Sequence, residues 1–117
     1  MPNPVTWFEI MGRDAGALQG FYSELFGWQL QQAGEGMNYG MLSNPDRGIG
    51  GGIGEAQGGP GHVTVYAEVD DPQAYLDKAE QLGGKTVVPV TEIPDMVTFA
   101  LFSDPEGHVV GVVRAQS

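Results

Sequence analysis

The sequence contains no cysteine, and this absence excludes several kinds of chemistry. Without thiols the chain can form no disulfide, bind no metal through thiolate and use no cysteine nucleophile. A long apolar run is also missing, because no uninterrupted stretch approaches the roughly 20 residues that cross a bilayer. Residues 1–7 show no basic region followed by an apolar segment, so no secretory signal is predicted and a cytoplasmic location is expected.

Basic residues are scarce. The sequence has five Lys and Arg and fifteen Asp and Glu, which gives a net charge of −10. Such a surface repels phosphate backbones and anionic lipids, so neither nucleic acid nor a membrane is expected as a partner. The same charge attracts a cationic small molecule, although acidity is also a common way of keeping a globular chain dispersed in water. The 117 residues, 41% of them hydrophobic, have the length and composition of one globular domain.

The sequence does contain an internal repeat. Residues 39–53, YGMLSNPDRGIGGGI, match residues 99–113, FALFSDPEGHVVGVV, at a constant offset of 60. Each segment predicts a strand, a turn containing Pro and Gly, and a second strand. Upstream, residues 7–10 and 66–69 each predict a strand that leads to an Asp and then to an apolar-periodic segment.

One helix is predicted in each repeat. Residues 15–26 follow Asp14 as N-cap and stop at Gly27. Residues 72–82 follow Asp71 and stop at Gly83. The spacing of apolar residues assigns the first helix a buried stripe of Leu18, Phe21, Tyr22 and Leu25. It assigns the second a buried stripe of Tyr75, Leu76, Ala79 and Leu82.

These elements predict an α+β fold of two β-α-β-β-β modules, about residues 4–55 and 61–115, joined by a glycine-rich linker at about 54–61. Neither module alone can bury its helix and its sheet, so one pseudo-symmetric domain over residues 1–117 is expected. The glycines of residues 48–61 are not assigned to phosphate binding. No Gly-Lys-Ser/Thr follows them, and their spacing does not match a Rossmann fingerprint.

Alternation along residues 62–69 predicts which side chains share a face of the sheet. Apolar residues expected against the helix are Val63, Val65, Ala67 and Val69, with Phe8 and Ile10 in the first module. A curved sheet would enclose a small-molecule pocket on its other face. The predicted ligand-binding residues there are Trp7, Glu9, His62, Thr64, Tyr66, Glu68, Gly51 and Gly111. The alternative is a sheet with one solvated face; the cost of leaving Trp7 and Tyr66 in water favours the pocket.

Several motifs resemble those of one superfamily. They are residues 7–10 (WFEI), 21–28 (FYSELFGW), 83–85 (GGK) and 104–107 (DPEG). In order and spacing they are similar to the vicinal-oxygen-chelate superfamily, which includes glyoxalase I, bleomycin-resistance proteins, extradiol dioxygenases and methylmalonyl-CoA epimerase. The resemblance covers essentially the whole chain. It implies a glyoxalase-like fold of curved mixed sheets with the helices on the outer face.

The resemblance also implies where metal ligands would lie. Metal-dependent members carry His and Glu on the first and last strands of each module. The matching positions here resemble Trp7, Thr64 or Tyr66, Gly51 and Gly111, and none of them is a good ligand for a hard divalent ion. Neither a metal nor another cofactor is therefore expected. The alternative is a relocated site at His62, Glu9 and Glu68.

The candidate catalytic residues are Glu9, Glu68, His62 and Tyr66. If both carboxyl groups lie in a dry cavity, one of them would hold a proton that it could transfer; if both are solvated near strand ends, they have no such role. Three functions follow: metal-free small-molecule binding, including sequestration or resistance; a glyoxalase-like lyase or isomerase activity; and a non-catalytic interaction module. The resemblance implies a homodimer, with Met37, Met41 and Met96 as exposed apolar candidates.

Overall fold

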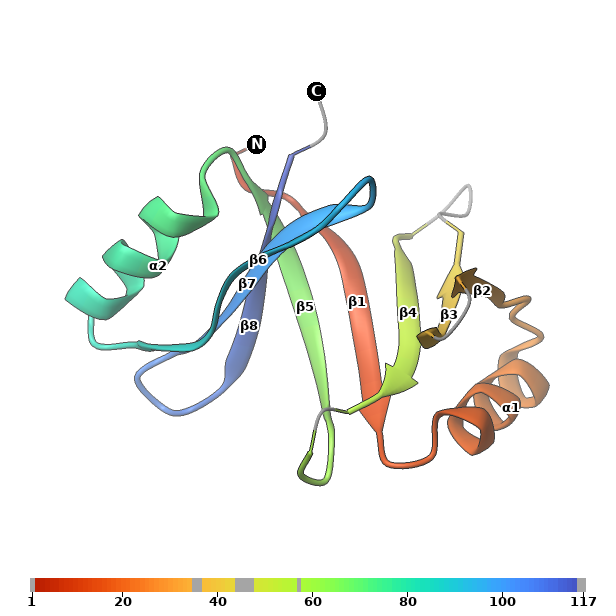
Figure 1. Cartoon of the computed structure of the whole chain (residues 1–117). Helices are drawn as coiled ribbons and strands as arrows, with labels where there is room; N and C mark the ends of the chain where they lie inside the picture. Colours follow the sequence, from red (N-terminus) through yellow and green to blue (C-terminus); the bar gives the residue numbers. More distant parts are fainter. Residues whose placement is uncertain (1, 35–36, 44–47, 57, 116–117) are drawn as a thin grey trace. The chain divides into compact units, whose positions relative to one another are not determined.

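A computed structural model describes residues 2–34, 37–43, 48–56 and 58–115, and only the backbone of Met37. The order β-α-β-β-β occurs twice, which confirms the predicted α+β class and its two modules (Figure 1). The first module comprises β1 (Val5–Gly12), α1 (Ala15–Phe26), β2 (Gln31–Gly34), β3 (Met37–Leu42) and β4 (Gly50–Glu55). The second comprises β5 (His62–Val69), α2 (Pro72–Gln81), β6 (Lys85–Ile93), β7 (Val97–Ser103) and β8 (Val109–Arg114). The predicted turn at 44–47 lies outside the described residues.

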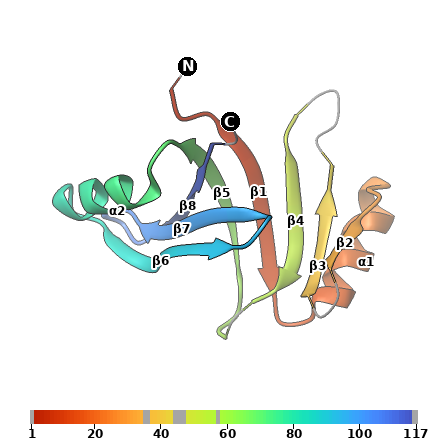
Figure 2. The ribbon, with the colours of Figure 1, turned by 45° about the horizontal axis from the view of Figure 1, so that its top comes forward.

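The chain forms two compact units, residues 7–64 and residues 1–6 with 65–117. In the first unit the strands are ordered β2-β3-β4-β1, with β1 parallel to β4 and the other pairs antiparallel. In the second the order is β5-β8-β7-β6, with β5 parallel to β8. One helix packs on one face of each mixed sheet (Figure 2). The two units therefore share a topology, as the repeat predicts.

Both helices begin and α1 ends where the capping residues predict, whereas α2 ends at Gln81, one residue earlier than predicted. Asp14 accepts a hydrogen bond from the Ala17 amide at 3.0 Å, and Gly27 ends α1 with a left-handed φ of 72°. Asp71 caps α2 in the same way, through the Ala74 amide at 3.4 Å. Neither of these described helices is long and apolar enough to cross a membrane.

The predicted buried stripe of α1 is partly wrong. Phe21 and Leu25 are 57% and 58% exposed. Gln19 packs toward the sheet instead, and its side-chain amide donates to the Ile53 carbonyl at 2.8 Å. The apolar residues of this helix occupy two neighbouring stripes, and spacing alone does not say which of them meets the sheet.

The core of the second unit forms between α2 and its sheet. Val69, Leu76, Ala100 and Val112 are buried there, and Tyr75, Val90 and Phe102 pack against them. Leu82 is 70% exposed, contrary to prediction, because it lies beyond the last helical turn. Val63 and Val65 are also exposed, contrary to prediction, because the helix packs around Val69 at the far end of β5.

Candidate ligand-binding site

Strand β1 presents different side chains to the two faces of its sheet. Gly12 lies directly under Leu18 of α1, and Phe8 contacts Trp28 with ring centroids 5.7 Å apart, so the even-numbered residues face the helix. Trp7 and Glu9 consequently project from the opposite, non-helix face of the first unit, the side on which the alternation places them.

Three side chains on this non-helix face form a hydrogen-bonded series, the Trp7–Tyr39–Glu9 chain. The Trp7 indole Nε1 donates to the Tyr39 hydroxyl at 3.0 Å, and that hydroxyl donates to Glu9 Oε2 at 2.9 Å. The Tyr39 ring lies flat over Gly52, where a Cβ would come within 2.0 Å of it. Glycine in β4 therefore makes room for the tyrosine, and the tyrosine orients the carboxylate.

The protonation of Tyr39 fixes the direction of this hydrogen bond. Burial and the neighbouring Glu9 carboxylate raise the pKa of Tyr39 far above the usual value of about 10. The hydroxyl therefore keeps its proton at physiological pH and acts as a donor to Glu9.

His62 lies on the other side of the same carboxylate. Its Nε2 is 4.0 Å from Glu9 Oε1, and the two side chains are 35% and 15% exposed. This separation is too long for a hydrogen bond. Nε2 is nevertheless buried and has no hydrogen-bond partner among the described residues. A buried polar atom without a partner is costly, so His62 Nε2 retains an unused hydrogen-bonding capacity beside the Glu9 carboxylate.

The remaining candidates, Thr64, Tyr66 and Glu68, follow His62 along β5. Thr64 and Tyr66 are almost fully buried, at 3% and 5% exposure. In the second unit the Tyr66 ring covers Gly111, where a Cβ would come within 2.3 Å of it, and it meets Phe99 edge-on. Tyr66 therefore fills the non-helix face of that unit. Glu68 is half-buried and lies beside Val113 of β8.

Gly51 does not lie on the non-helix face, so this prediction is wrong. It pairs with Phe8 in the β1–β4 register, and the Phe8 ring covers it on the helix side. The glycine beside Glu9 on the non-helix face is Gly52, one residue later. A shift of one residue in a strand moves a side chain to the other face.

Tyr39 is the residue of this candidate site that the sequence analysis did not predict. Two signals could have found it. Gly52 and Gly54 alternate within a strand, and glycine there often marks close approach by another group. Tyr39 also aligns with Phe99 in the repeat, so the hydroxyl is present in the first module alone.

The described residues do not fit a divalent metal. They contain no group of three or more His, Cys, Asp and Glu side chains that could hold one. Trp7 and the two glycines of the expected ligand positions offer no side-chain donor. Glu9 and His62 are only two donors, and one Glu9 oxygen already accepts from Tyr39. No chemical step is therefore assigned to a metal here.

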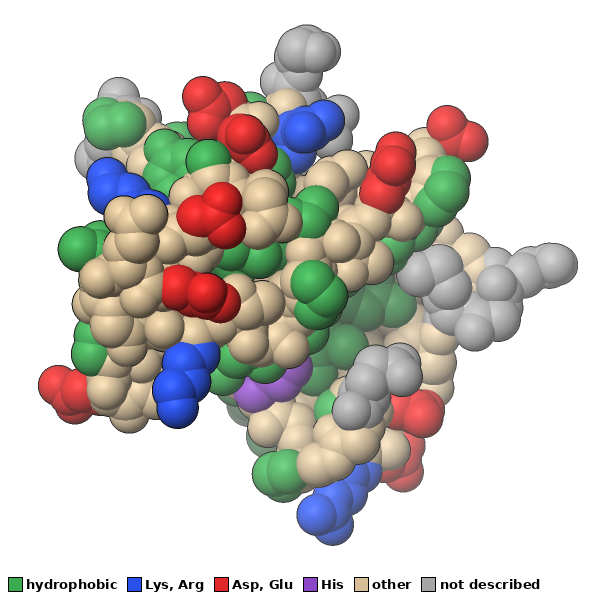
Figure 3. Space-filling view, turned by 60° about the vertical axis from the view of Figure 1, so that its left-hand side comes forward, with side chains coloured by type: hydrophobic (Ala, Val, Ile, Leu, Met, Phe, Trp, Pro, Cys, Tyr) green, Lys and Arg blue, Asp and Glu red, His purple; other side chains and the backbone are tan. Residues whose placement is uncertain are grey.

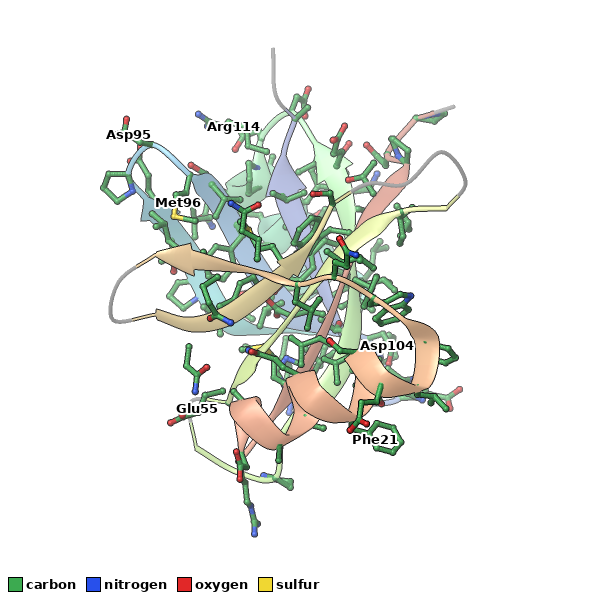
Figure 4. All side chains as sticks on the ribbon, turned by 90° about the vertical axis from the view of Figure 1, so that its right-hand side faces the viewer. Phe21, Glu55, Asp95, Met96, Asp104 and Arg114 are labelled. Carbon is green, nitrogen blue, oxygen red and sulfur yellow. The ribbon has the colours of Figure 1, made fainter. Side chains whose placement is uncertain are left out.

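A second hollow lies in the second unit, between the β6–β7 hairpin and the end of β8. Its volume is about 370 Å³, and its lining includes Glu92 together with Asp95, Met96 and Arg114. Figure 4 labels the last three of these side chains. None of the predicted site residues lines it. Of the three methionines expected on the surface, Met96 is 41% exposed and Met41 is half-buried, while the side chain of Met37 lies outside the described residues.

Comparison with known proteins identifies the family. A family model described as a glyoxalase-like domain matches residues 7–113. The chain belongs to the glyoxalase-like domain family. It is 31% identical over 111 residues to a Mycobacterium tuberculosis protein named "Putative glyoxylase CFP32", covering 92% of this chain and 42% of that protein. It is 28% identical over 131 residues to the anthracycline biosynthesis protein DnrV of Streptomyces peucetius, covering 97% and 47%. The glyoxalase-like chain thus spans less than half the length of these relatives.

Solved structures confirm the superfamily fold. Methylmalonyl-CoA epimerase from Mycobacterium tuberculosis superposes with a TM-score of 0.66 at 14% identity, covering 97% of this chain and 88% of that one. A glyoxalase/bleomycin resistance protein/dioxygenase superfamily member from Vibrio splendidus 12B01 gives 0.64 at 15% identity, covering 97% and 99%. At this identity the likeness concerns the fold and not the chemistry.

Proposed function

We propose that this glyoxalase-like chain binds a small organic cation on the non-helix face of its first unit, between Glu9 and His62. The observation that carries the proposal is the buried, unpartnered Nε2 of His62, 4.0 Å from a carboxylate that the Trp7–Tyr39–Glu9 chain holds in place. An ammonium group that reaches both side chains could donate one N–H to Glu9 and another to His62 Nε2, which would supply the missing partner of that nitrogen.

Each residue has a distinct part in this binding. Glu9 supplies the acceptor and the negative charge. Tyr39 and Trp7 do not contact the ligand in this account; they are positioning residues that fix the carboxylate before the ligand arrives, which lowers the entropy lost on binding. His62 contributes Nε2 as an acceptor, which requires the neutral tautomer with its proton on Nδ1.

The charge of the whole chain supports a cationic ligand over an anionic one. The net charge is −10. On the face shown in Figure 3, acidic side chains are scattered among a few Lys and Arg rather than gathered in one place. A net negative charge of this size raises the local concentration of cations near the surface. Sequestration of a cationic compound, as in resistance, is the physiological role that we propose.

A second candidate function uses the same pair of residues. A carboxylate and an imidazole 4.0 Å apart can pass a proton through a bound substrate, which is the chemistry of a metal-free isomerase or lyase. The two functions differ in one readout, because a sequestering protein returns its ligand unchanged and an enzyme does not.

Calorimetric titration with paired ligands tests the proposal. Each pair consists of an organic ammonium compound, aliphatic or aromatic, and its neutral isostere of the same size. We expect the cations alone to bind, and Glu9→Gln to weaken binding by roughly tenfold to a hundredfold, as for other buried charge-assisted hydrogen bonds. Glu106→Gln, an exposed change of the same charge, is the control and should leave binding unchanged. Equal binding of both members of a pair would contradict the proposal, and chromatography of the recovered ligand detects turnover.

A further inference from the structure

The hollow between the β6–β7 hairpin and the end of β8 carries charges of both signs. Glu92, Asp95 and Arg114 line it, together with apolar side chains of the hairpin. Figure 4 shows Asp95 and Arg114 at the same end of the second unit. The volume of about 370 Å³ is at the lower end of the range for small-molecule sites, so a ligand of amino-acid size is the largest class that it suits.

Strand pairing places charged side chains of the hollow on one face of the sheet. Ala100 and Val112 are partners in the β7–β8 register, and both belong to the core under α2. Alternation puts Thr98 and Arg114, each two residues away, on that same face. Thr98 in turn pairs with Glu92 of β6. The three side chains therefore form a row across three strands on the helix side of the sheet, opposite to the face predicted to bind a ligand.

The charges in this hollow are not paired with one another. Among the described residues neither Glu92 nor Asp95 forms an ion pair with Arg114, although the chain has fifteen acidic residues for five basic ones. Neighbouring strands lie about 4.8 Å apart, so the backbones at Glu92 and Arg114, with β7 between them, are about 10 Å apart. A molecule with a positive and a negative end can reach both side chains across that distance.

The backbone at Asp95 is a second, independent observation. Its φ is 63°, in the left-handed region, within a turn closed by the Met96 amide and the Ile93 carbonyl at 3.0 Å. Glycine or asparagine is preferred at this position of such a turn, because glycine adopts it without strain. The sequence thus keeps a carboxylate in the hollow at a position that local backbone energy alone would give to another residue.

The first unit shows that the fold does not need these charges. Its strands have the same order as those of the second unit. Its β2, the counterpart of β6, contains no charged residue. Its β4, the counterpart of β8, ends in Glu55, whereas β8 ends in Arg114. The charges of the hollow are therefore not a requirement of the architecture, and recognition of a ligand explains them.

We propose that this hollow binds a small zwitterion, a free amino acid with an apolar side chain. Arg114 pairs with the carboxylate of the ligand through two parallel hydrogen bonds. Glu92 and Asp95 accept from its ammonium group, and Met96 contacts its apolar side chain. A simple anion would meet two carboxylates without a compensating charge, and a simple cation would meet the guanidinium, so a ligand with both charges is preferred over either.

NMR of the full chain with 13C-labelled methionine methyl groups tests the proposal, with L-leucine as the probe. The Met96 signal should shift and saturate, while those of Met11 and Met41 in the first unit should not move. Met96→Leu assigns the signal. Removal of the carboxylate from leucine gives 3-methylbutylamine, and removal of the ammonium group gives 4-methylpentanoate. Each should bind about fivefold more weakly than leucine, or worse, because each lacks one charge-assisted contact.

Variants identify the side chains that bind the two charges. Arg114→Gln should weaken leucine binding about fivefold or more and abolish the preference for leucine over 3-methylbutylamine. Asp95→Asn keeps a residue that tolerates the left-handed turn, and should also weaken leucine binding. Arg13→Gln, a change of the same charge at an exposed residue of the first unit, is the matched control. Far-UV circular dichroism verifies that each variant is folded.

Glu9→Gln separates this site from the proposed cation site of the first unit, and should leave the response of Met96 to leucine unchanged. A Met96 signal that does not move as leucine approaches its solubility limit would overturn the inference. So would equal binding of leucine and both analogues, or a response that survives Arg114→Gln or disappears in Arg13→Gln or Glu9→Gln.

Discussion

At the scale of single residues, the account depends on Tyr39. Its hydroxyl accepts from Trp7 and donates to Glu9, so one oxygen determines the position of two neighbours. The second module has Phe99 at the equivalent place in the repeat, and no such polar series is formed there by the described residues. At this position the two halves therefore differ by one oxygen atom, and in the first module that oxygen joins Trp7 to Glu9.

Removing that oxygen should destabilise the protein. Tyr39→Phe removes the hydroxyl that accepts from the Trp7 indole nitrogen and donates to Glu9, which costs about 1–3 kcal/mol of unfolding free energy. Urea denaturation measures this change. Tyr75→Phe is the control, because the Tyr75 hydroxyl makes only an exposed, 3.4 Å contact with Asn3. Equal losses in both variants would show that the Trp7–Tyr39–Glu9 chain adds no stability.

The raised pKa of Tyr39 also predicts a dependence on alkaline pH. The unfolded chain loses the tyrosine proton near pH 10, whereas the folded chain retains it well above that pH. The folded state thus binds more protons above about pH 10, and its stability falls there, by up to about 1.4 kcal/mol per pH unit from this group. Denaturation at successive pH values should show a shallower fall in Tyr39→Phe. Stability curves that fall with the same slope in the wild type and in Tyr39→Phe would contradict a raised pKa of Tyr39.

At the scale of elements, the glycines of β4 leave room for the Tyr39 ring on the non-helix face of the first sheet. A Cβ at Gly52 would lie 2.0 Å from the Tyr39 ring, so Gly52→Ala must displace the ring and the carboxylate with it. We expect a loss of about 1–3 kcal/mol, as for overpacked cores, together with lost cation binding. Gly16→Ala on α1, where the nearest atom is 3.7 Å away, should not reduce stability. Thermal unfolding of both variants makes the comparison.

The element scale also shows what the sequence could predict. Asp14 and Gly27 define α1 because capping is a local property of the chain. Which side of α1 faces the sheet depends on packing against residues far away in the sequence. The spacing of Phe21 and Leu25 therefore predicted the wrong buried stripe. The same holds for Gly51, since a strand's register relative to its neighbour cannot be obtained from alternation alone.

At the scale of the whole molecule, the repeat predicted the topology of both halves but not their difference in chemistry. Trp7, Glu9 and His62 were expected on the non-helix face, and the structure brings Glu9 within reach of both a tyrosine and a histidine. The contacts of Tyr39 join strands that are far apart in the sequence. Hydrogen bonds between residues 30 and 32 positions apart leave no periodic signal in a sequence.

The most direct test of the account follows the two histidines by NMR during titration with a cation that binds. The chain has only His62 and His108. His108 is exposed, paired with Asp104 at 3.1 Å, and serves as an internal control. The account predicts that the ring nitrogens of His62 shift on binding while those of His108 do not, and that Glu9→Gln removes the response. A saturating ligand that leaves His62 unmoved, or moves both histidines equally, would contradict a cation site between Glu9 and His62.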